Sequence, residues 1–171
     1  MTDTTFDDIS IDDAALAELS GATRVLAATD DGTDPELVYE RKAAARLAAR
    51  LGATLFLSDR SLRTWGETPH TRGPATLEQL RADGIEHMVA QMEEAMALGV
   101  GEVYAVAPSM PSLESVDLAV EATDPSVVVV PPRFEETTLG DRVQMRGDLV
   151  KAVRDRAKVV VAHPDGRITL A

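Results

Sequence analysis

The sequence predicts an α/β domain built as a parallel sheet with helices on both faces. Short apolar runs alternate along the chain with longer segments of helical periodicity, which implies right-handed crossovers and a helix–sheet–helix sandwich. The run Ser126–Val130 holds consecutive valines, which is typical of a strand buried on both faces of a parallel sheet. With 171 residues the chain is long enough to bury the core of one domain.

Five strands are expected, each a short apolar run bounded by turn-forming or polar residues. In chain order they are Arg24–Thr29, Thr54–Leu57, Glu102–Val106, Ser126–Val130 and Lys158–Ala162. The fifth is expected at an edge of the sheet. The short run Arg167–Leu170 follows it, and we expect this run either to cover that edge or to join an interface.

Two long helical patterns lie between the first three strands. The first spans about Asp34–Leu51, opened by a capping aspartate with Pro35 behind it and ended by Gly52. Its inner stripe is Leu37, Ala44, Leu47, Ala48 and Leu51. The second spans about Thr76–Leu98, with a break expected near Asp83-Gly84. Its core-facing stripe is Ile85, Met88, Val89, Met92 and Met96. Further helices are expected over about residues 112–122 and from residue 141 or 147 to residue 156.

Composition and charge exclude several classes of protein. The net charge of −12 argues against nucleic acid as a partner, because phosphate backbones require a basic surface. The absence of cysteine excludes disulfides and thiolate metal sites. Since no apolar run approaches the roughly 20 residues that span a bilayer and residues 1–10 do not resemble a secretory signal, we expect a cytoplasmic protein without a membrane partner.

The first 20 residues carry acids without any lysine or arginine. The acids are Asp3, Asp7, Asp8, Asp12, Asp13 and Glu18. Such a charge block is usually a solvated, loosely ordered tail, although the apolar residues among them permit a short helix that docks on the body. We therefore divide the chain into an acidic N-terminal extension, residues 1–21, and an α/β domain, residues 22–171.

The end of the first strand is the strongest candidate for a binding site. Asp30 and Asp31 follow its apolar run directly, and in parallel α/β sheets ligands bind at the carboxyl ends of the strands. A second interpretation makes Asp30 a turn acid that satisfies backbone donors before the helix, which Asp31-Gly32 favours.

Three stretches together resemble the universal stress protein family, over roughly residues 22–162. Val25–Gly32 resembles the opening strand with its terminal aspartate, Ala43–Ala53 the first helix, and Gly147–Val161 the closing helix and strand. The resemblance implies a Rossmann-like, flavodoxin-like three-layer sandwich with strand order 3-2-1-4-5. It also implies a homodimer through the fifth strand and ATP or AMP in a crevice between strands one and four, near Asp30.

The segment after the fourth strand departs from the glycine-rich pattern that cradles phosphates in nucleotide-binding members. Phe134 and Thr137 stand where that pattern has glycines, and Asp148 stands where it has Ser or Thr. Pro131 and Pro132 lack N–H donors, and Glu135 and Glu136 repel phosphate. Only Gly147, with Gly140 nearby, remains of the pattern. We therefore expect no cofactor, or weakly bound ATP or AMP with a dissociation constant above roughly 0.1 mM.

Arg133, Arg142 and Arg146 could supply a different anion site through their guanidinium groups, or instead pair with neighbouring acids on a solvated loop. His70, His87 and His163 are far apart and show no metal-binding spacing.

The leading hypothesis is a dimeric, stress-protein-like domain without catalytic activity and with a degraded nucleotide crevice. The alternatives are a genuine ATP or AMP binder that uses Asp30, the backbone near Leu57–Asp59 and the arginine-bearing loop, and a small α/β enzyme with its site in the same crevice.

Overall fold

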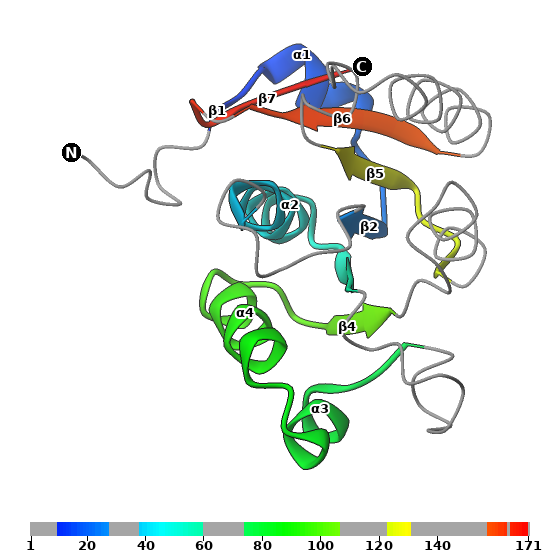
Figure 1. The fold of residues 1–171 in the computed structure, drawn as a ribbon. Coiled ribbons are helices and arrows are strands. Elements are labelled where there is room, and N and C mark those ends of the chain that lie inside the picture. Colours follow the sequence, from blue (N-terminus) through cyan, green and yellow to red (C-terminus); the bar gives the residue numbers. More distant parts are fainter. Residues whose placement is uncertain are drawn as a thin grey trace, which may run out of the picture.

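A computed structural model shows one mixed sheet with helices packed against it (Figure 1). The structure describes residues 10–27, 38–59, 74–106, 123–130, 157–163 and 165–170. The strands are β1 (Ser10–Ile11), β2 (Arg24–Ala27), β3 (Thr54–Ser58), β4 (Val103–Val106), β5 (Val127–Val130), β6 (Lys158–Ala162) and β7 (Arg167–Leu170). The helices are α1 (Asp13–Glu18), α2 (Val38–Leu51), α3 (Leu77–Asp83) and α4 (Glu86–Ala97). This is the α/β class that the alternation of strands and helices predicts.

The sheet has seven strands in the order β1-β7-β6-β5-β2-β3-β4. The predicted count of five is therefore wrong, and the order 3-2-1-4-5 is incomplete because β7 and β1 extend the sheet beyond β6. Every pairing is parallel except that of β6 with β7, which is antiparallel. The parallel pairing of β2 with β5 joins Leu26 to Val128 and was expected from the buried valine run.

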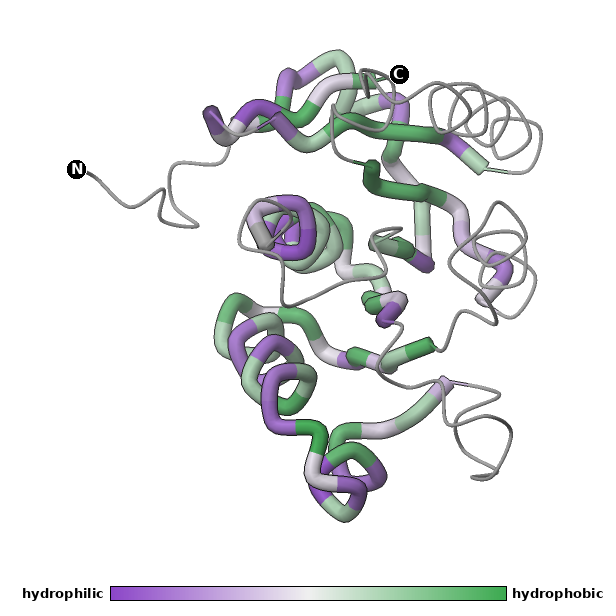
Figure 2. Tube along the Cα trace, in the orientation of Figure 1, coloured by the Kyte–Doolittle hydropathy of each residue, from purple (hydrophilic) through white to green (hydrophobic). Residues whose placement is uncertain are grey.

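The four described helices pack on one face of the sheet, where their apolar side chains and those of the strands form one buried cluster. A second cluster, which includes Leu26, Phe56, Val128 and Val159, lies on the opposite face. The hydrophobic character of β5 and β6 is visible along both strands in Figure 2. The other predicted helices, over residues 112–122 and 141–156, lie outside the described residues, so their covering of the second face stays a prediction.

The predicted break in the second long helix is confirmed. Gly84 separates α3 from α4 with φ of 73°, a left-handed conformation that glycine adopts without a steric penalty. Thr76 caps α3, and its hydroxyl accepts from the N–H of Gln79 in a capping box. The predicted core stripe of α4 is wrong at Met96, which is 47% exposed, because the buried stripe passes through Ala95 in the last turn.

The interpretation of residues 1–20 as a loosely ordered tail is wrong for residues 10–19. Ser10 and Ile11 form β1, which pairs with the start of β7, and α1 follows. Ile11 and Leu19 are buried and belong to the core cluster. The alternative of a short docked helix is thus the correct one for this segment, because its apolar residues gain more by burial than its acids lose by staying at the surface.

The expectation that the fifth predicted strand lies at an edge is also wrong. The strand β6 pairs with β5 on one side and with β7 on the other, so both of its main-chain edges are occupied. A tight turn makes this possible, since Gly166 has φ of 92° and its N–H donates to the carbonyl of His163. Of the two outcomes expected for Arg167–Leu170, covering the edge is the one observed.

Candidate functional site

The parallel strands β2 to β6 all end at the same edge of the sheet. The chain leaves β2 toward β3 and β4, and only later crosses to β5 and β6 on the other side of β2. The boundary between β2 and β5 is therefore a topological switch point, where open α/β sheets bind ligands. The six predicted binding residues follow these two strands in the sequence but lie outside the described residues: Asp30, Asp31, Arg133, Gly140, Gly147 and Asp148.

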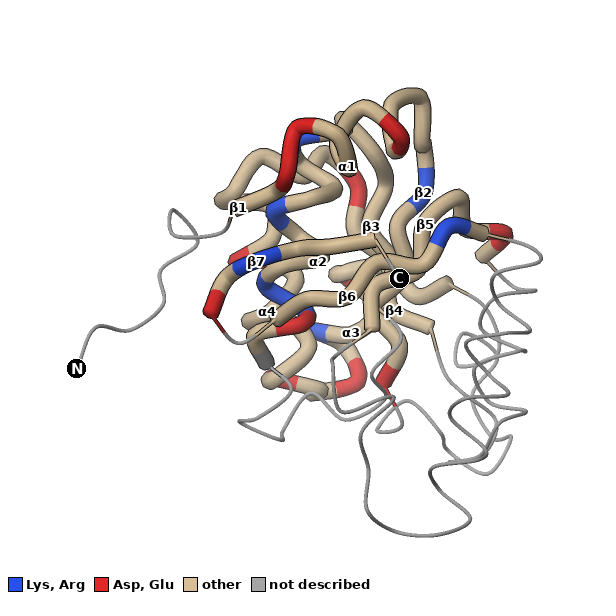
Figure 3. Tube along the Cα trace, turned by 90° about the horizontal axis from the view of Figure 1, so that it is seen from above, with Lys and Arg blue, Asp and Glu red and all other residues tan. Residues whose placement is uncertain are grey.

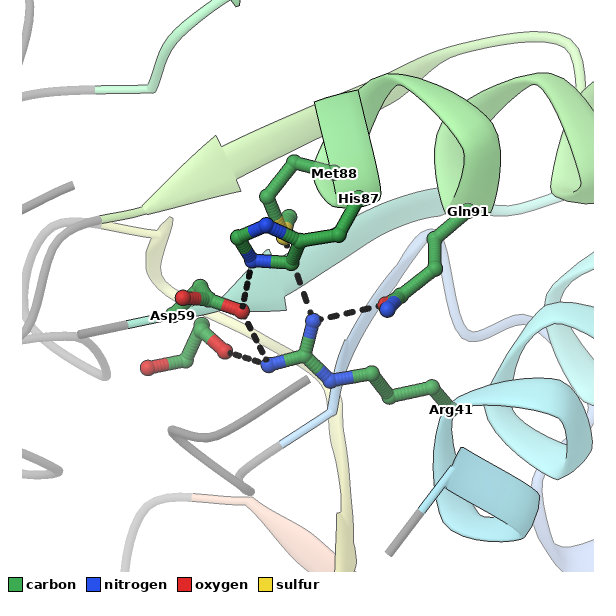
Figure 4. Close-up of polar contacts among 6 residues, drawn as sticks. Arg41, Asp59, His87, Met88 and Gln91 are labelled. Carbon is green, nitrogen blue, oxygen red and sulfur yellow. Dashed lines mark hydrogen bonds and ion pairs between the residues drawn. The ribbon is translucent and has the colours of Figure 1, made fainter. Parts of the chain in front are cut away.

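A buried polar cluster occupies the described part of this edge, at the end of β3 (Figure 4). We call it the Arg41 cluster, and it consists of Arg41, Asp59, His87, Met88 and Gln91. The arginine comes from α2, the aspartate follows β3 directly, and the other three come from α4. The cluster thus joins two helices to the end of a strand that neighbours β2.

The Arg41 guanidinium is the centre of this cluster. Its Nη2 lies 3.1 Å from Oδ2 of Asp59 and also donates to the backbone carbonyl of Ser58. Its Nη1 donates to Oε1 of Gln91 at 2.7 Å and contacts Sδ of Met88 at 3.2 Å. The Arg41 side chain is 3% exposed and that of Asp59 is 2% exposed, so this ion pair is buried.

Asp59 connects the Arg41 guanidinium to His87 of α4, whose side chain is less deeply buried. Its Oδ2 lies 3.3 Å from Nε2 of His87, whose side chain is 30% exposed. The backbone N–H of Asp59 donates to the carbonyl of Val106 at 3.0 Å, which continues the pairing of β3 with β4. Asp59 is therefore held by its backbone and by its side chain at once.

This arrangement is suited to holding groups in place. A carboxylate that accepts from an imidazole fixes the orientation of the ring. Because the same oxygen of Asp59 is shared with a guanidinium, its charge is already balanced before the imidazole is considered. The Arg41 cluster therefore acts as a rigid support at the carboxyl edge.

A hollow between α2 and α4 borders the cluster, with Arg41, Leu57 and Gln91 among its lining residues. Its volume of about 20 Å³ has room for a water molecule but not for a nucleotide. This hollow is therefore not a nucleotide site.

The other residues considered from the sequence are placed as follows. His163 follows β6 and its Nε2 lies 2.8 Å from Oγ1 of Thr169, remote in strand order from the Arg41 cluster. Tyr104 of β4 packs on Phe56 with ring centroids 5.7 Å apart. His70 lies outside the described residues. Among the residues that the structure describes, His, Asp and Glu side chains form no group of three or more that could hold a metal ion.

The sequence predicts a role for the backbone near Leu57–Asp59 and a buried Met88, but not the polar contacts that Arg41 makes with Asp59 and Gln91. A signal was present, because Arg41 lies three and seven residues before Ala44 and Ala48, on the inner stripe of α2. An arginine on an apolar stripe indicates a buried charge that requires a partner. The partner itself, on another element, was not visible in the local pattern.

With this geometry established, the chain can be compared with known proteins. It has the fold of a universal stress protein whose crystal structure was determined in complex with cAMP, with a TM-score of 0.56. The two are 18% identical, and the match covers 84% of this chain and 98% of that chain. No protein-family model and no curated protein matches the sequence. The likeness therefore establishes a universal-stress-protein-like fold.

Within the part of the chain that is described, none of the helices combines the length and apolar character needed to cross a membrane.

Proposed function

We propose that this chain is a universal-stress-protein-like domain that binds an adenine nucleotide weakly at the carboxyl edge of its sheet, forms a homodimer and has no catalytic activity. One observation carries the binding proposal. The strands β2 and β5 are parallel neighbours at the point where the strand order reverses. In an open α/β sheet this is where a ligand finds both strand ends and the following helix N-termini.

The residues proposed to hold the nucleotide come after these two strands. Asp30 and Asp31 follow β2 and would contact the base or ribose, whereas Arg133, Gly140 and Gly147 follow β5 and would lie near phosphate. Asp148 would weaken phosphate binding through its charge. The fold neighbour bound to cAMP supports a nucleotide with one phosphate, because a single charge requires fewer donors than a triphosphate does.

Titration calorimetry with cAMP, AMP and ATP tests this proposal. We expect ATP to bind with a dissociation constant above roughly 0.1 mM and cAMP to bind at least as tightly as ATP. The variant Asp30→Ala should weaken binding, whereas Asp165→Ala, a matched change in the β6–β7 turn, should not. Low-micromolar ATP binding would show that the segment after β5 holds a triphosphate. Failure of all three nucleotides to bind would remove the proposal.

The homodimer now requires a different contact from the one predicted. Since β6 is paired on both sides and Val160 is buried in the core, the contact would lie at the outer margin formed by β7 and β1. Leu170 is exposed there. Light scattering at micromolar concentration should give twice the mass of the chain, and Leu170→Glu should reduce that mass to one chain. A wild-type chain that stays monomeric contradicts this part of the proposal.

A further inference from the structure

The carbonyl of Ser58 and the carboxylate of Asp59 share one guanidinium as partner. Arg41 reaches both from α2, and its other terminal nitrogen is bonded to Gln91 of α4 (Figure 4). The peptide unit between Ser58 and Asp59 is therefore fixed from the helical face of the sheet. On its other side the N–H of Asp59 is bonded to β4.

A buried ion pair is a poor means of stabilising a fold. Removing two charges from water costs several kcal/mol per ion, and apolar residues of similar volume often stabilise a core equally well. What an arginine adds is geometry, because its planar group holds its two terminal nitrogens in a fixed relation: Nη2 reaches Ser58 and Asp59 while Nη1 is bonded to Gln91 of α4. This argues that the position of its acceptors matters in this protein.

Those acceptors lie at the carboxyl end of β3, beside β2. Leu57 is paired with Ala27, the last described residue of β2, so Ser58 and Asp59 continue β3 at the level where β2 ends. The proposed nucleotide crevice would open at this level, between the ends of β2 and β5, with β3 on the other side of β2. A shift of the Ser58–Asp59 peptide would therefore move one wall of that crevice.

We propose that Arg41 is a positioning residue of the nucleotide crevice, which fixes the Ser58–Asp59 peptide as a preformed wall. This inference rests on the proposed function. Preorganisation of this kind improves affinity because the ligand does not have to order the wall on binding. Arg41 itself is buried and acts through the peptide that it holds.

The hydrogen-exchange rates of single amides report how firmly the Ser58–Asp59 peptide is held, without any ligand. The N–H of Asp59 donates to Val106 and the N–H of Leu55 donates to Glu102, so both report on the pairing of β3 with β4. In Arg41→Met we expect the Asp59 amide to exchange about tenfold faster relative to the Leu55 amide. The matched control is Arg81→Met, which removes the exposed pair with Glu93 and should change neither amide.

A conservative variant separates positioning from simple charge balance. Arg41→Lys keeps the positive charge but has a single nitrogen on a flexible stem, so it lacks the second terminal nitrogen that anchors the planar group to Gln91. We expect it to recover much of the stability lost in Arg41→Met while leaving the Asp59 amide fast relative to Leu55. If lysine restores Asp59 protection completely, or if both amides accelerate equally, the positioning role is wrong. This variant also serves if Arg41→Met does not fold.

The second readout is the affinity for cAMP measured by calorimetry. We expect Arg41→Lys to weaken cAMP binding about tenfold and Arg81→Met to leave it unchanged. Unchanged affinity in Arg41→Lys, with binding intact in the wild type, overturns the inference alone. Absence of cAMP, AMP and ATP binding in the wild type overturns the proposed function and the inference with it, so the two failures are distinguishable.

Discussion

Two arginine–aspartate pairs among the described residues lie in contrasting surroundings. Arg41 and Asp59 lie in the interior between α2, β3 and α4, with 3.1 Å between nitrogen and oxygen. Arg167 and Asp165 lie in the β6–β7 turn, with 2.7 Å between the corresponding atoms. The side chains of the first pair are almost fully covered, whereas those of the second are 62% and 56% exposed. Figure 3 shows the described Lys, Arg, Asp and Glu positions distributed along several helices and strands.

The distance between nitrogen and oxygen does not by itself decide which of the two pairs contributes more to stability. Water screens the shorter contact in the turn, and two mobile side chains lose entropy when they form it. The longer contact in the interior is screened much less, and loss of either residue removes from a buried charge the oppositely charged group with which it forms an ion pair. Burial rather than length is therefore expected to decide how much each arginine matters.

The largest effect is expected from breaking the buried pair. Arg41→Met removes the guanidinium and leaves the Asp59 carboxylate in the interior. We expect it to lower the free energy of unfolding by about 4 kcal/mol, measured by urea denaturation. Arg167→Met, the same substitution in the exposed pair, should leave the urea midpoint unchanged within error. Equal losses in the two variants would show that burial does not govern these pairs.

A somewhat smaller effect on the free energy of unfolding is expected from truncating a buried apolar side chain of β7. Ile168 of β7 is buried in the core cluster, one residue from the exposed Arg167. Ile168→Ala should lower the free energy of unfolding by about 3 kcal/mol, because it leaves a cavity as well as losing apolar burial. Its control is Met96→Ala on α4, where an apolar side chain is exposed. If both cost the same, β7 is not packed as described.

A third variant tests whether burial of an ion pair, or its position on the helical face, sets its effect on stability. Arg81 and Glu93 join α3 to α4 on the helical face that also carries the Arg41 cluster, but both side chains are about half exposed. Arg81→Met should cost less than about 0.5 kcal/mol in urea denaturation. Raising the salt concentration should reduce even that difference. A loss near that of Arg41→Met would mean that the interface between these helices, rather than burial, sets the effect.

The smallest effect concerns the titration of Asp165. The backbone N–H of Arg167, followed by its guanidinium, holds the pKa of Asp165 below the ordinary value of 3.8. A carboxyl whose pKa is lowered by folding adds stability above its unfolded pKa, and this is lost as the pH falls through the folded pKa. The contribution is thus present at neutral pH and disappears below about pH 4. Carbon-13 NMR of the Asp165 carboxyl should show the lowered midpoint, and Arg167→Met should raise it. An unaltered midpoint in that variant would contradict the assignment.

Much of the fold is visible in local sequence patterns. The valine run predicts β5, and Gly84 predicts the break between α3 and α4. Periodicity predicts Met88 and Met92 as core residues of α4, and both are fully buried. These predictions succeed because strand and helix periods, caps and glycine conformations depend on neighbouring residues.

Apart from Met96 on α4, the failures concern contacts between distant segments. The start of the chain forms β1 only because Ser10 meets Arg167 near the other end of the sequence. The strand β6 is not an edge because β7 turns back on it. The sequence predicts that the candidate site lies at the carboxyl ends of the strands. The six residues predicted to bind there lie outside the described residues, so their roles remain predictions.

The sequence by itself determined the class of the domain and the alternation of strands and helices that follows β1 and α1, since both depend on periodicity along the chain. Only the tertiary structure decided which strands form the margins of the sheet and which charges are buried. An arginine on the inner stripe of α2 requires an acceptor, but that acceptor lies after β3 and its further partners lie on α4. The energy of a buried charge depends on groups brought together by folding, and no local pattern contains them.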